Sequence, residues 1–230
     1  MAQQRELGTV LITGGASGLG AAIAAAVADR GGRSVVLDIN PGDRPDAYRA
    51  DVSDTRETER LVAELAEQYG GFDAVVTAAG IDRPAAFDEL SGAEWESIVA
   101  VNLLGTVAVV RAALPSLLAV HGRVVTIASS LGLRVFPDAS AYCASKFAVV
   151  GFSRALAAET KGRLGVTTVF PAGMDTSFFD GREERYKPSA DAQLIGAADA
   201  AEAILFALTR PAGVEVREIV ICPEQEPSWP

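Results

Sequence analysis

The chain has 230 residues and a mass of 23.9 kDa, enough for one large domain or two small ones with a sizeable core. Hydrophobic residues make up 49% and charged residues 22%, a globular composition that excludes an intrinsically disordered chain. Asp and Glu outnumber Lys and Arg by 30 to 20, and the net charge of -10 argues against binding to nucleic acid or to an anionic membrane surface.

Short runs of β-branched residues alternate with longer helical patterns along the chain. The expected strands are residues 9–13, 34–37, 73–77, 123–128, 165–170 and 218–222, with a weaker seventh at 48–50. The expected helices are residues 19–30, 55–69, 92–120, 140–160 and 197–209. Because alternating strands and helices imply right-handed crossovers, we predict an α/β fold: a single doubly wound Rossmann-type domain, residues 1–230, with a parallel sheet of about seven strands flanked by helices.

Three connecting segments carry predictions of their own. Residues 38–46 are short and leave room for about one helical turn. Residues 176–194 are polar and lack a clear period, so we expect a mobile loop over the site. Residues 223–230 are too rich in proline to continue a strand, and we expect them to pack along the surface or a partner subunit.

Two apolar stretches have the length of export or membrane segments, but their residues favour a different interpretation. Residues 7–28 carry no charge, yet their five glycines break a continuous helix and favour a strand, a glycine loop and a helix. Residues 103–120 contain Arg111 and Pro115, which favours a buried helix over a membrane span. We therefore expect a soluble, cytoplasmic protein that does not attach to a membrane.

Few residues are available for metal or nucleophilic chemistry. The two cysteines, Cys143 and Cys222, cannot build a disulfide framework, and no cluster of cysteine and histidine indicates a metal site. The only histidine, His121, lies in a polar connection typical of a surface turn. These observations disfavour zinc chemistry and a histidine-dependent catalytic triad.

The first strand leads directly into a glycine-rich loop, residues 14–20, and then into an alanine-rich helix. Glycines allow the sharp turn and let backbone N–H groups approach a pyrophosphate at the positive end of the helix. A glycine-rich loop alone is weak evidence, but one that follows a strand and opens a helix indicates a dinucleotide site. A purely structural turn of small residues is the alternative interpretation.

Asp38 closes the second strand, 18 residues after Gly20, near the spacing of about 20 expected for the acid that binds the adenosine ribose. A carboxylate there accepts hydrogen bonds from the ribose hydroxyls and repels a 2′-phosphate. The glycine loop holds no Arg or Lys, and Ile39 rather than a basic residue follows Asp38. We therefore predict NAD as the cofactor, preferred over NADP; an Asp that only forms a turn is the alternative.

Tyr142 and Lys146 stand four residues apart in an expected helix, so both side chains share one face. A free tyrosine has a pKa of about 10, too high for a base near neutral pH. An ammonium nearby favours the phenolate, typically by about 1–3 pKa units, which makes Tyr142 a candidate general acid and base. A surface tyrosine above a solvated lysine is the alternative.

With these features in place, the sequence resembles the classical short-chain dehydrogenase/reductase family over nearly its whole length. The motifs that carry the resemblance are the TGxxxGxG loop (residues 13–20), the cofactor-selecting acid (Asp38), the adenine-contacting pair (Asp51 and Val52), the catalytic asparagine (Asn102), the serine in IASS (residues 127–130) and YxxxK (Tyr142 to Lys146). The resemblance implies hydride transfer between NAD(H) and a secondary alcohol or ketone.

The resemblance also implies roles for individual residues. Ser130 would polarise the substrate oxygen and Tyr142 would pass the proton. Lys146 would hold the nicotinamide ribose and lower the pKa of Tyr142, while Asn102 would bend its helix and hold a water that links Lys146 to solvent. The residues implied to bind the cofactor are Gly14, Ser17, Gly18, Leu19, Gly20, Asp38, Ile39, Asp51, Val52, Ala78, Ala79, Gly80, Val101, Tyr142, Lys146, Pro171, Gly173, Met174 and Thr176.

Four departures from the family pattern bear on these roles. The NNAG motif reads TAAG at residues 77–80, and the PGxxxT segment at residues 171–176 has a displaced glycine. Ser130 precedes Tyr142 by 12 residues, one fewer than the commonest spacing; Ser129 restores that spacing, but the strand alignment VTIASS favours Ser130. The segment that would cover the substrate is also shorter than usual.

The substrate is expected to be a small to medium, fairly apolar secondary alcohol or ketone. The apolar residues that suggest this are Leu131, Leu133, Phe136, Phe178 and Phe179, which serve equally well as core or subunit contacts. The polar run at residues 182–187 is expected to be a solvated loop. Two alternatives remain: an epimerase or dehydratase that retains NAD, and a dinucleotide sensor without activity. Members of the family assemble through the helices expected at 92–120 and 140–160, which predicts a homo-oligomer, a tetramer or a dimer.

Overall fold

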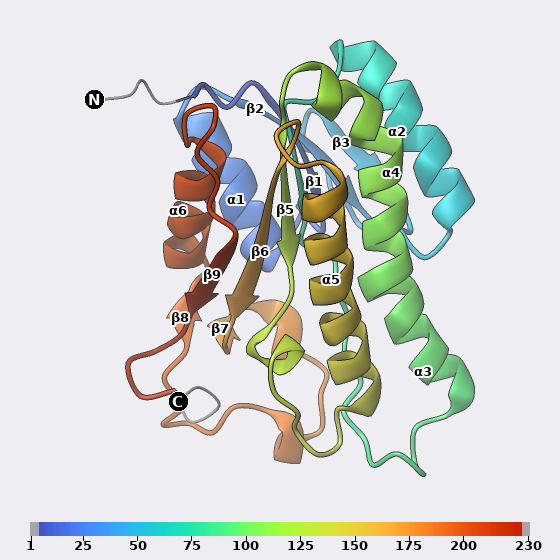
Figure 1. Cartoon of the computed structure of the whole chain (residues 1–230). Helices are drawn as coiled ribbons and strands as arrows, with labels where there is room; N and C mark the ends of the chain where they lie inside the picture. The colour runs from blue at the N-terminus through green and yellow to red at the C-terminus, as the bar shows by residue number, and fades with distance from the viewer. Residues whose placement is uncertain (1–4, 227–230) are drawn as a thin grey trace.

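The computed structural model describes residues 5–226, which form a parallel sheet with helices on both faces (Figure 1). The sheet contains seven strands in the order β3-β2-β1-β4-β5-β6-β9, and every neighbouring pair is parallel. Its strands are β1 (Thr9–Thr13), β2 (Arg33–Asp38), β3 (Ala47–Arg49), β4 (Ala74–Thr77), β5 (Arg123–Ile127), β6 (Gly165–Pro171) and β9 (Glu218–Ile221). The doubly wound α/β fold predicted from the sequence is confirmed.

The helices lie in two layers. They are α1 (Gly18–Asp29), α2 (Thr55–Tyr69), α3 (Gly92–Val99), α4 (Thr106–Ala119), α5 (Ser140–Glu159) and α6 (Ala197–Leu208). Helices α1 and α6 cover one face of the sheet, and α2, α4 and α5 cover the other (Figure 1). A short second ladder pairs β7 (Met174–Asp175) with β8 (Ile195–Gly196) beyond the carboxyl end of β6.

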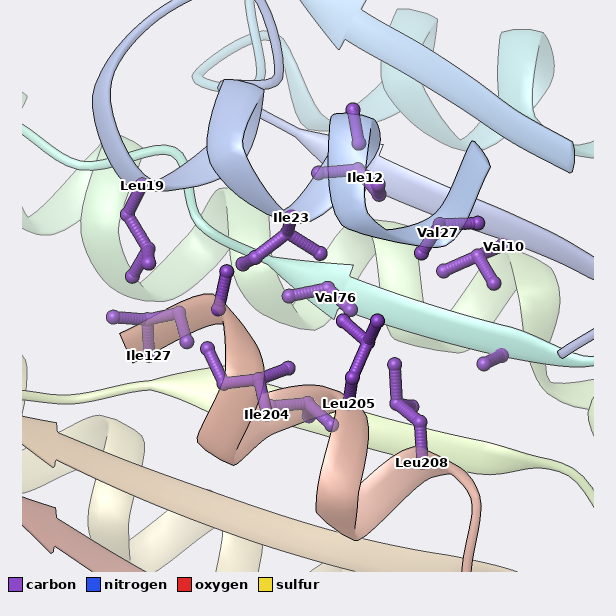
Figure 2. Close-up of a cluster of buried hydrophobic side chains, with 14 of the residues drawn as sticks. Val10, Ile12, Leu19, Ile23, Val27, Val76, Ile127, Ile204, Leu205 and Leu208 are labelled. Carbon is purple, nitrogen blue, oxygen red and sulfur yellow. The ribbon is translucent and has the colours of Figure 1, made fainter. Parts of the chain in front are cut away.

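Alternate residues of each strand contribute to opposite layers of the core. In β1, Val10 and Ile12 pack under α1 and α6, whereas Leu11 packs under α2 and α4. Figure 2 shows the first layer, in which Ile23 of α1 and Leu205 of α6 lie over the strands. All five side chains are almost completely buried. Since both faces of the sheet are covered, its central strands are continuous apolar runs rather than alternating ones.

The strand order reverses at β1, which pairs with β2 on one side and with β4 on the other. Thr13 at the end of β1 is in register with Thr77 at the end of β4. The glycine loop after β1 and the residues after β4 therefore leave the same edge of the sheet side by side. In open α/β sheets, ligands bind in the crevice that such a reversal creates at the carboxyl ends of the strands.

The expected single long helix forms three parts. Helices α3 and α4 flank a π-helical segment, Ala100–Gly105, whose wider turn contains Asn102. By length and composition, the run Gly92–Ala119 is apolar enough to cross a membrane. Val109 and Leu117, however, are fully buried in the layer of the core next to the sheet. The run is therefore a core helix of this fold, as the sequence indicated.

The connection between β2 and β3 is short, as expected, and its room for about one helical turn is not used. Residues 39–46 contain bends and turns but no helical turn. Pro41 and Pro45 lack the backbone N–H that a helix requires, and Gly42 has a φ of 67°. This segment connects β2 to β3 as an irregular loop.

Two further expectations concern segments near the site. Residues 176–194 form short turns at the carboxyl end of the sheet, and their mobility stays a prediction. The expected packing of residues 223–230 falls partly on 227–230, which lie outside the described residues. Within the described part, Gln225 and Glu226 line the cavity described below.

Candidate active site

The carboxyl ends of β1, β2, β4, β5 and β6 surround a cavity of about 1100 Å³. Every residue predicted to bind the cofactor lines it: Gly14, Ser17, Gly18, Leu19, Gly20, Asp38, Ile39, Asp51, Val52, Ala78, Ala79, Gly80, Val101, Tyr142, Lys146, Pro171, Gly173, Met174 and Thr176. Of the predicted catalytic residues, Ser130, Tyr142 and Lys146 line the same cavity. Asn102 is 1% exposed and lies buried beside Gly80.

The glycine loop between β1 and α1 depends on residues without a side chain. Gly14 and Gly18 have φ of 66° and 50°, in the left-handed region that glycine tolerates best. A Cβ on Gly20 would lie 2.1 Å from the carbonyl oxygen of Gly14. The loop therefore folds tightly against the start of α1 and leaves its backbone exposed to the cavity.

The N-terminus of α1 has no capping side chain. Its cap residue, Ser17, makes no side-chain cap hydrogen bond, and the first turn holds no acidic residue. By contrast, Asp54 caps α2, and Ser91 with Glu94 forms a capping box on α3. The first N–H groups of α1 are thus available for an anion at the positive end of the helix. This loop and helix end fit the pyrophosphate of a dinucleotide.

Asp38 is held at the end of β2 by two backbone donors. Its carboxylate accepts hydrogen bonds from the N–H of Ala16 at 3.1 Å and of Asn40 at 2.9 Å. Sequence reasoning missed Arg44, whose guanidinium donates to the carbonyl of Gly15 at 3.2 Å. Only the conformation of residues 39–46 brings that cation to the glycine loop. A carboxylate therefore faces the cavity, with a basic group close by.

Tyr142 and Lys146 meet on one face of α5, as their spacing predicts. The Nζ atom of Lys146 lies 5.5 Å from the centre of the Tyr142 ring and donates to the carbonyl of Ile127 at 2.9 Å. Lys146 is 4% exposed. The ring of Phe178 packs 5.9 Å from that of Tyr142. The phenol and the ammonium are thereby fixed between β5 and residues 176–194.

Burial dominates the titration of both groups. Burial raises the pKa of Tyr142 above that of a free tyrosine, and the charge of Asp82 raises it further. A hydrogen bond from Ser129 and the charge of Arg182 lower the pKa of Tyr142. Burial lowers the pKa of Lys146 to about 8, against the opposing charge of Asp82. The sequence predicted that Lys146 lowers the pKa of Tyr142, but in this structure burial raises that pKa, and the opposing contributions come from Ser129 and Arg182 rather than from Lys146.

The two adjacent serines have different surroundings. Ser129 has an extended backbone, with φ of -171° and ψ of 163°, and its hydroxyl accepts from the N–H of Leu131 at 3.1 Å. A hydrogen bond from the same hydroxyl lowers the pKa of Tyr142. Ser130 begins the turn that follows and also lines the cavity. Ser130, the serine favoured by the strand alignment, stays a predicted catalytic residue, and Ser129, the serine at the commoner family spacing, is the one whose hydrogen bond lowers the pKa of Tyr142.

Asn102 links the loop after β4 to α5. Its Oδ1 accepts from the N–H of Ile81 at 2.8 Å, and its Nδ2 donates to the carbonyl of Ile81 at 3.0 Å. The same Nδ2 donates to Ser145 Oγ at 3.0 Å. The backbone carbonyl of Asn102 accepts from the hydroxyl of Thr106 at 2.9 Å. The side chain therefore holds Gly80 and its neighbours in place beside Lys146.

A buried ion pair that sequence reasoning missed also lines the cavity. Asp82, just after β4, lies 3.1 Å from Arg182, and their side chains are 7% and 12% exposed. The Arg182 guanidinium lies over the rings of Phe178 and Phe179, at 4.9 Å and 4.7 Å from their centres. The expectation of a solvated loop at residues 182–187 is wrong for Arg182. The sequence around Arg182 does not indicate that it pairs with Asp82, which lies 100 residues earlier.

The apolar candidates divide between the cavity and the core. Leu131, Phe136, Phe178 and Phe179 line the cavity. Leu133 instead packs against a buried cluster that contains Ala128, Val149, Val150 and Phe170. One wall of the cavity is therefore aromatic and apolar, next to the Tyr142 phenol.

The sheet is parallel and doubly wound, and the glycine loop and the uncapped end of α1 lie where its strand order reverses. With the buried Tyr-Lys pair beside them, these features are typical of a dinucleotide-dependent oxidoreductase. A sequence profile described as short chain dehydrogenase matches residues 8–187. The chain belongs to this short chain dehydrogenase family and is an oxidoreductase of that family. Within residues 5–226, no group of three or more His, Cys, Asp or Glu side chains is placed to hold a metal ion.

Individual relatives agree with this assignment. A D-threitol dehydrogenase of Mycolicibacterium smegmatis is 39% identical over 176 residues, which cover 70% of this chain and 68% of that protein. An uncharacterized oxidoreductase of Staphylococcus aureus is 32% identical over 226 residues, which cover 93% of this chain and 96% of that protein. The solved structure of an alcohol dehydrogenase from Thermococcus sibiricus, complexed with 5-hydroxy-NADP, has a TM-score of 0.81 at 26% identity and covers 93% of this chain and 95% of that one.

Proposed function

We propose that this protein is an NAD-dependent oxidoreductase that interconverts a secondary alcohol and its ketone. The observation that carries the proposal is the Tyr142 phenol, held beside Lys146 and Ser129 in the cavity into which the uncapped end of α1 opens. A proton carrier next to a dinucleotide-binding helix end is the combination that alcohol oxidation requires.

The preference for NAD over NADP rests on Asp38. Its carboxylate lines the cavity at the end of β2 and is oriented by Ala16 and Asn40. A carboxylate in that place accepts the ribose hydroxyls and repels a 2′-phosphate. Arg44 lies nearby, but its guanidinium is engaged with the carbonyl of Gly15, and Arg44 does not line the cavity. The Thermococcus relative was complexed with an NADP analogue, so the proposed preference for NAD is supported by Asp38 and not by that relative.

NAD supplies the hydride acceptor when bound, and the chain supplies the proton chemistry. The Ser129 hydroxyl donates to the substrate oxygen and keeps it beside the phenol. Tyr142 removes the hydroxyl proton during oxidation and returns it during reduction. Lys146 would hold the nicotinamide ribose, and its ammonium, 5.5 Å from the centre of the Tyr142 ring, would favour the phenolate, the form that burial disfavours.

Asn102 acts through position rather than contact with substrate. Its side-chain amide holds both backbone groups of Ile81 and the hydroxyl of Ser145. These hydrogen bonds keep the loop after β4 against α5, so that Gly80 stays next to Lys146. The water that the family resemblance implies between Asn102 and Lys146 would complete the path of the proton to solvent.

The substrate is a small to medium alcohol whose carbon skeleton packs on the apolar wall of the cavity. Leu131, Phe136, Phe178 and Phe179 form that wall. Burial of aliphatic carbon against such side chains is favourable at roughly 25 cal/mol per Å². The reacting carbon would then lie between this wall and Tyr142.

We also propose that the protein is a cytoplasmic homotetramer. Leu104 and Phe147, on the elements that follow β4 and β5, are 48% and 44% exposed, which is typical of side chains that a second subunit covers. Cys143 and Cys222 are free, as suits a reducing compartment. Light scattering that reports a monomer at micromolar concentration would reject the tetramer.

A cofactor titration tests the proposed function. NADH and NADPH are added to the wild type and to Asp38→Ala, and binding is followed by nicotinamide fluorescence. We expect tighter NADH binding by about tenfold to a hundredfold in the wild type and loss of that preference in the variant. Asp43→Ala, which removes the same charge from an exposed position outside the cavity, on the loop that follows Asp38, is the matched control and should keep the preference.

The titration is then combined with turnover on a panel of secondary alcohols with NAD. Tight NADH binding with NADH formed from at least one alcohol supports the proposal. NAD retained through purification with no net NADH would instead indicate the epimerase or dehydratase class. NADH binding with no chemistry on any substrate would indicate a dinucleotide sensor.

A further inference from the structure

The buried Asp82–Arg182 pair influences the pKa of Tyr142 but does not itself carry the proton. Asp82 comes from the loop after β4 and Arg182 from residues 176–194, and their closest atoms are 3.1 Å apart. With side-chain exposures of 7% and 12%, both charges are withdrawn from bulk water. A buried ion pair contributes little net stability, because desolvation offsets the attraction. Its place in the wall of the cavity calls for a functional explanation.

Each member of the pair has one polar atom left without a partner. Among the described residues, Asp82 Oδ1 and Arg182 Nε are buried and make no hydrogen bond. Native proteins rarely leave such atoms unpaired. One is an acceptor and the other is a donor, on two side chains that already touch. A ligand group that both donates and accepts would satisfy the two atoms together.

The pair lies close to the group that carries the proton. Arg182 lies over the Phe178 ring at 4.9 Å, and Phe178 in turn packs 5.9 Å from the Tyr142 ring. The charges of both Asp82 and Arg182 act on the pKa of Tyr142, in opposite directions. Arg182 and Tyr142 therefore contact the same ring in the wall of one cavity. A substituent on a carbon next to the reacting carbon would face the ion pair.

The charges and the unpaired atoms of Asp82 and Arg182 determine which chemical group of a substrate can bind next to them. A carboxylate or phosphate would be repelled by Asp82, and an ammonium would be repelled by Arg182. A hydrocarbon would leave both atoms unpaired. A neutral hydroxyl donates its hydrogen to Asp82 Oδ1 and accepts from Arg182 Nε, so it satisfies both atoms without adding charge.

We propose that Asp82 and Arg182 bind a second hydroxyl group of the substrate, so that the enzyme acts on diols and polyols in which this hydroxyl is close to the reacting carbon. This proposal rests on the proposed function and narrows its substrate. The carbon skeleton lies on the wall formed by Phe178 and Phe179, the reacting hydroxyl faces Tyr142, and the second hydroxyl faces the ion pair.

Pairs of alcohols that differ by one hydroxyl test the proposal. The probes are butane-2,3-diol against butan-2-ol, and cyclohexane-1,2-diol against cyclohexanol, each with NAD. The wild type should favour the diol in kcat/KM by about tenfold to a hundredfold, the range of one hydrogen bond to a charged group. Because both members of a probe pair use Tyr142, effects on proton transfer cancel in the ratio.

The double variant Asp82→Leu/Arg182→Met removes both charges together. Replacing a buried ion pair by apolar residues of similar volume is often neutral for stability, so this variant is expected to fold. Its diol preference should fall to within about threefold of unity, the level at which no hydrogen bond contributes. Asp82→Asn is the second variant, because it keeps the shape of the side chain and removes the charge. A wild-type ratio near one, or a ratio unchanged in the double variant, would overturn the proposal.

A binding measurement separates this proposal from the proposed function. If the wild type turns over neither member of any probe pair, the proposed function fails. Thermal unfolding then decides the hydroxyl site, since a ligand of the folded state raises Tm with its concentration. A rise in Tm with cyclohexane-1,2-diol but not with cyclohexanol, absent in the double variant, supports the site. Equal shifts for both probes, or none, reject it.

Discussion

Removal of the Ser129 hydroxyl should abolish most of the activity, whereas removal of the Ser130 hydroxyl should not. In the structure the Ser129 oxygen accepts from the N–H of Leu131 at 3.1 Å, which orients its own hydrogen away from the backbone. The same hydroxyl lowers the pKa of the Tyr142 phenol through a hydrogen bond, and the substrate oxygen must reach that phenol. One positioned donor at a reacting oxygen is worth about 100- to 1000-fold in kcat. We expect a loss of that size in Ser129→Ala.

The matched control is Ser130→Ala, a substitution of the same size in the next residue of the same cavity wall. The assay is steady-state formation of NADH from the best alcohol of the panel, with NADH binding measured on the same samples. Ser129→Ala should keep its affinity for NADH, since the cofactor is bound by other residues. Ser130→Ala should stay within about tenfold of the wild type in kcat, which is less than the loss of a positioned donor. A larger loss in Ser130→Ala than in Ser129→Ala would refute the assignment.

The remaining predictions concern the glycine loop and the pH profile. Gly20→Ala places a Cβ 2.1 Å from a loop carbonyl oxygen and should destabilise the protein by about 1–3 kcal/mol in urea unfolding, with weaker NADH binding. Gly92→Ala, where a Cβ meets nothing within 4 Å at the start of a helix, should be neutral or up to about 1 kcal/mol stabilising. Asp82 raises the pKa of Tyr142, so Asp82→Asn should lower it and shift the acid limb of kcat/KM for oxidation to lower pH. Arg182 lowers the pKa of Tyr142, so Arg182→Met should shift the acid limb of kcat/KM to higher pH. If both variants shifted the acid limb in the same direction, the electrostatic account would be contradicted.

The fold was accessible from the sequence because its signals are local. The strands are buried on both faces, so they stand out as short β-branched runs such as residues 9–13 and 165–170. The weak strand predicted at 48–50 forms as β3 (Ala47–Arg49) because it pairs with β2. The long apolar pattern at 92–120 did not reveal its π-helical segment, since a single wider turn barely changes the spacing of apolar residues.

The cofactor half of the site was accessible for a different reason. The glycines lie in the loop directly after β1, and Asp38 lies at the end of β2. Because these positions are fixed by the strands and by the spacing along the chain, the sequence alone places them at the same edge of the sheet. All of the predicted cofactor residues therefore line one cavity. The choice between Ser129 and Ser130 was not fixed by the sequence, because the spacing from Tyr142 favours one serine and the strand alignment favours the other, and both line the cavity.

The apolar wall of the cavity was partly accessible from the sequence, whereas the ion pair in that wall was not. Asp82 and Arg182 lie 100 residues apart, and each alone resembles an exposed charge in a polar segment. Their pairing depends on the course of residues 176–194, a segment without helical or strand period. Phe178 turns toward Tyr142 for the same reason. Irregular segments take their conformation from tertiary contacts, which no local pattern records.

Turnover by Tyr142→Phe tests the central claim most directly. The substitution keeps the ring beside Phe178 and removes only the phenolic oxygen that carries the proton. We predict that the variant binds NADH as tightly as the wild type while its kcat for alcohol oxidation falls at least about 100-fold, the contribution of a general acid or base. Turnover within about threefold of the wild type, with NADH still bound, would show that Tyr142 does not carry the proton and would contradict the account.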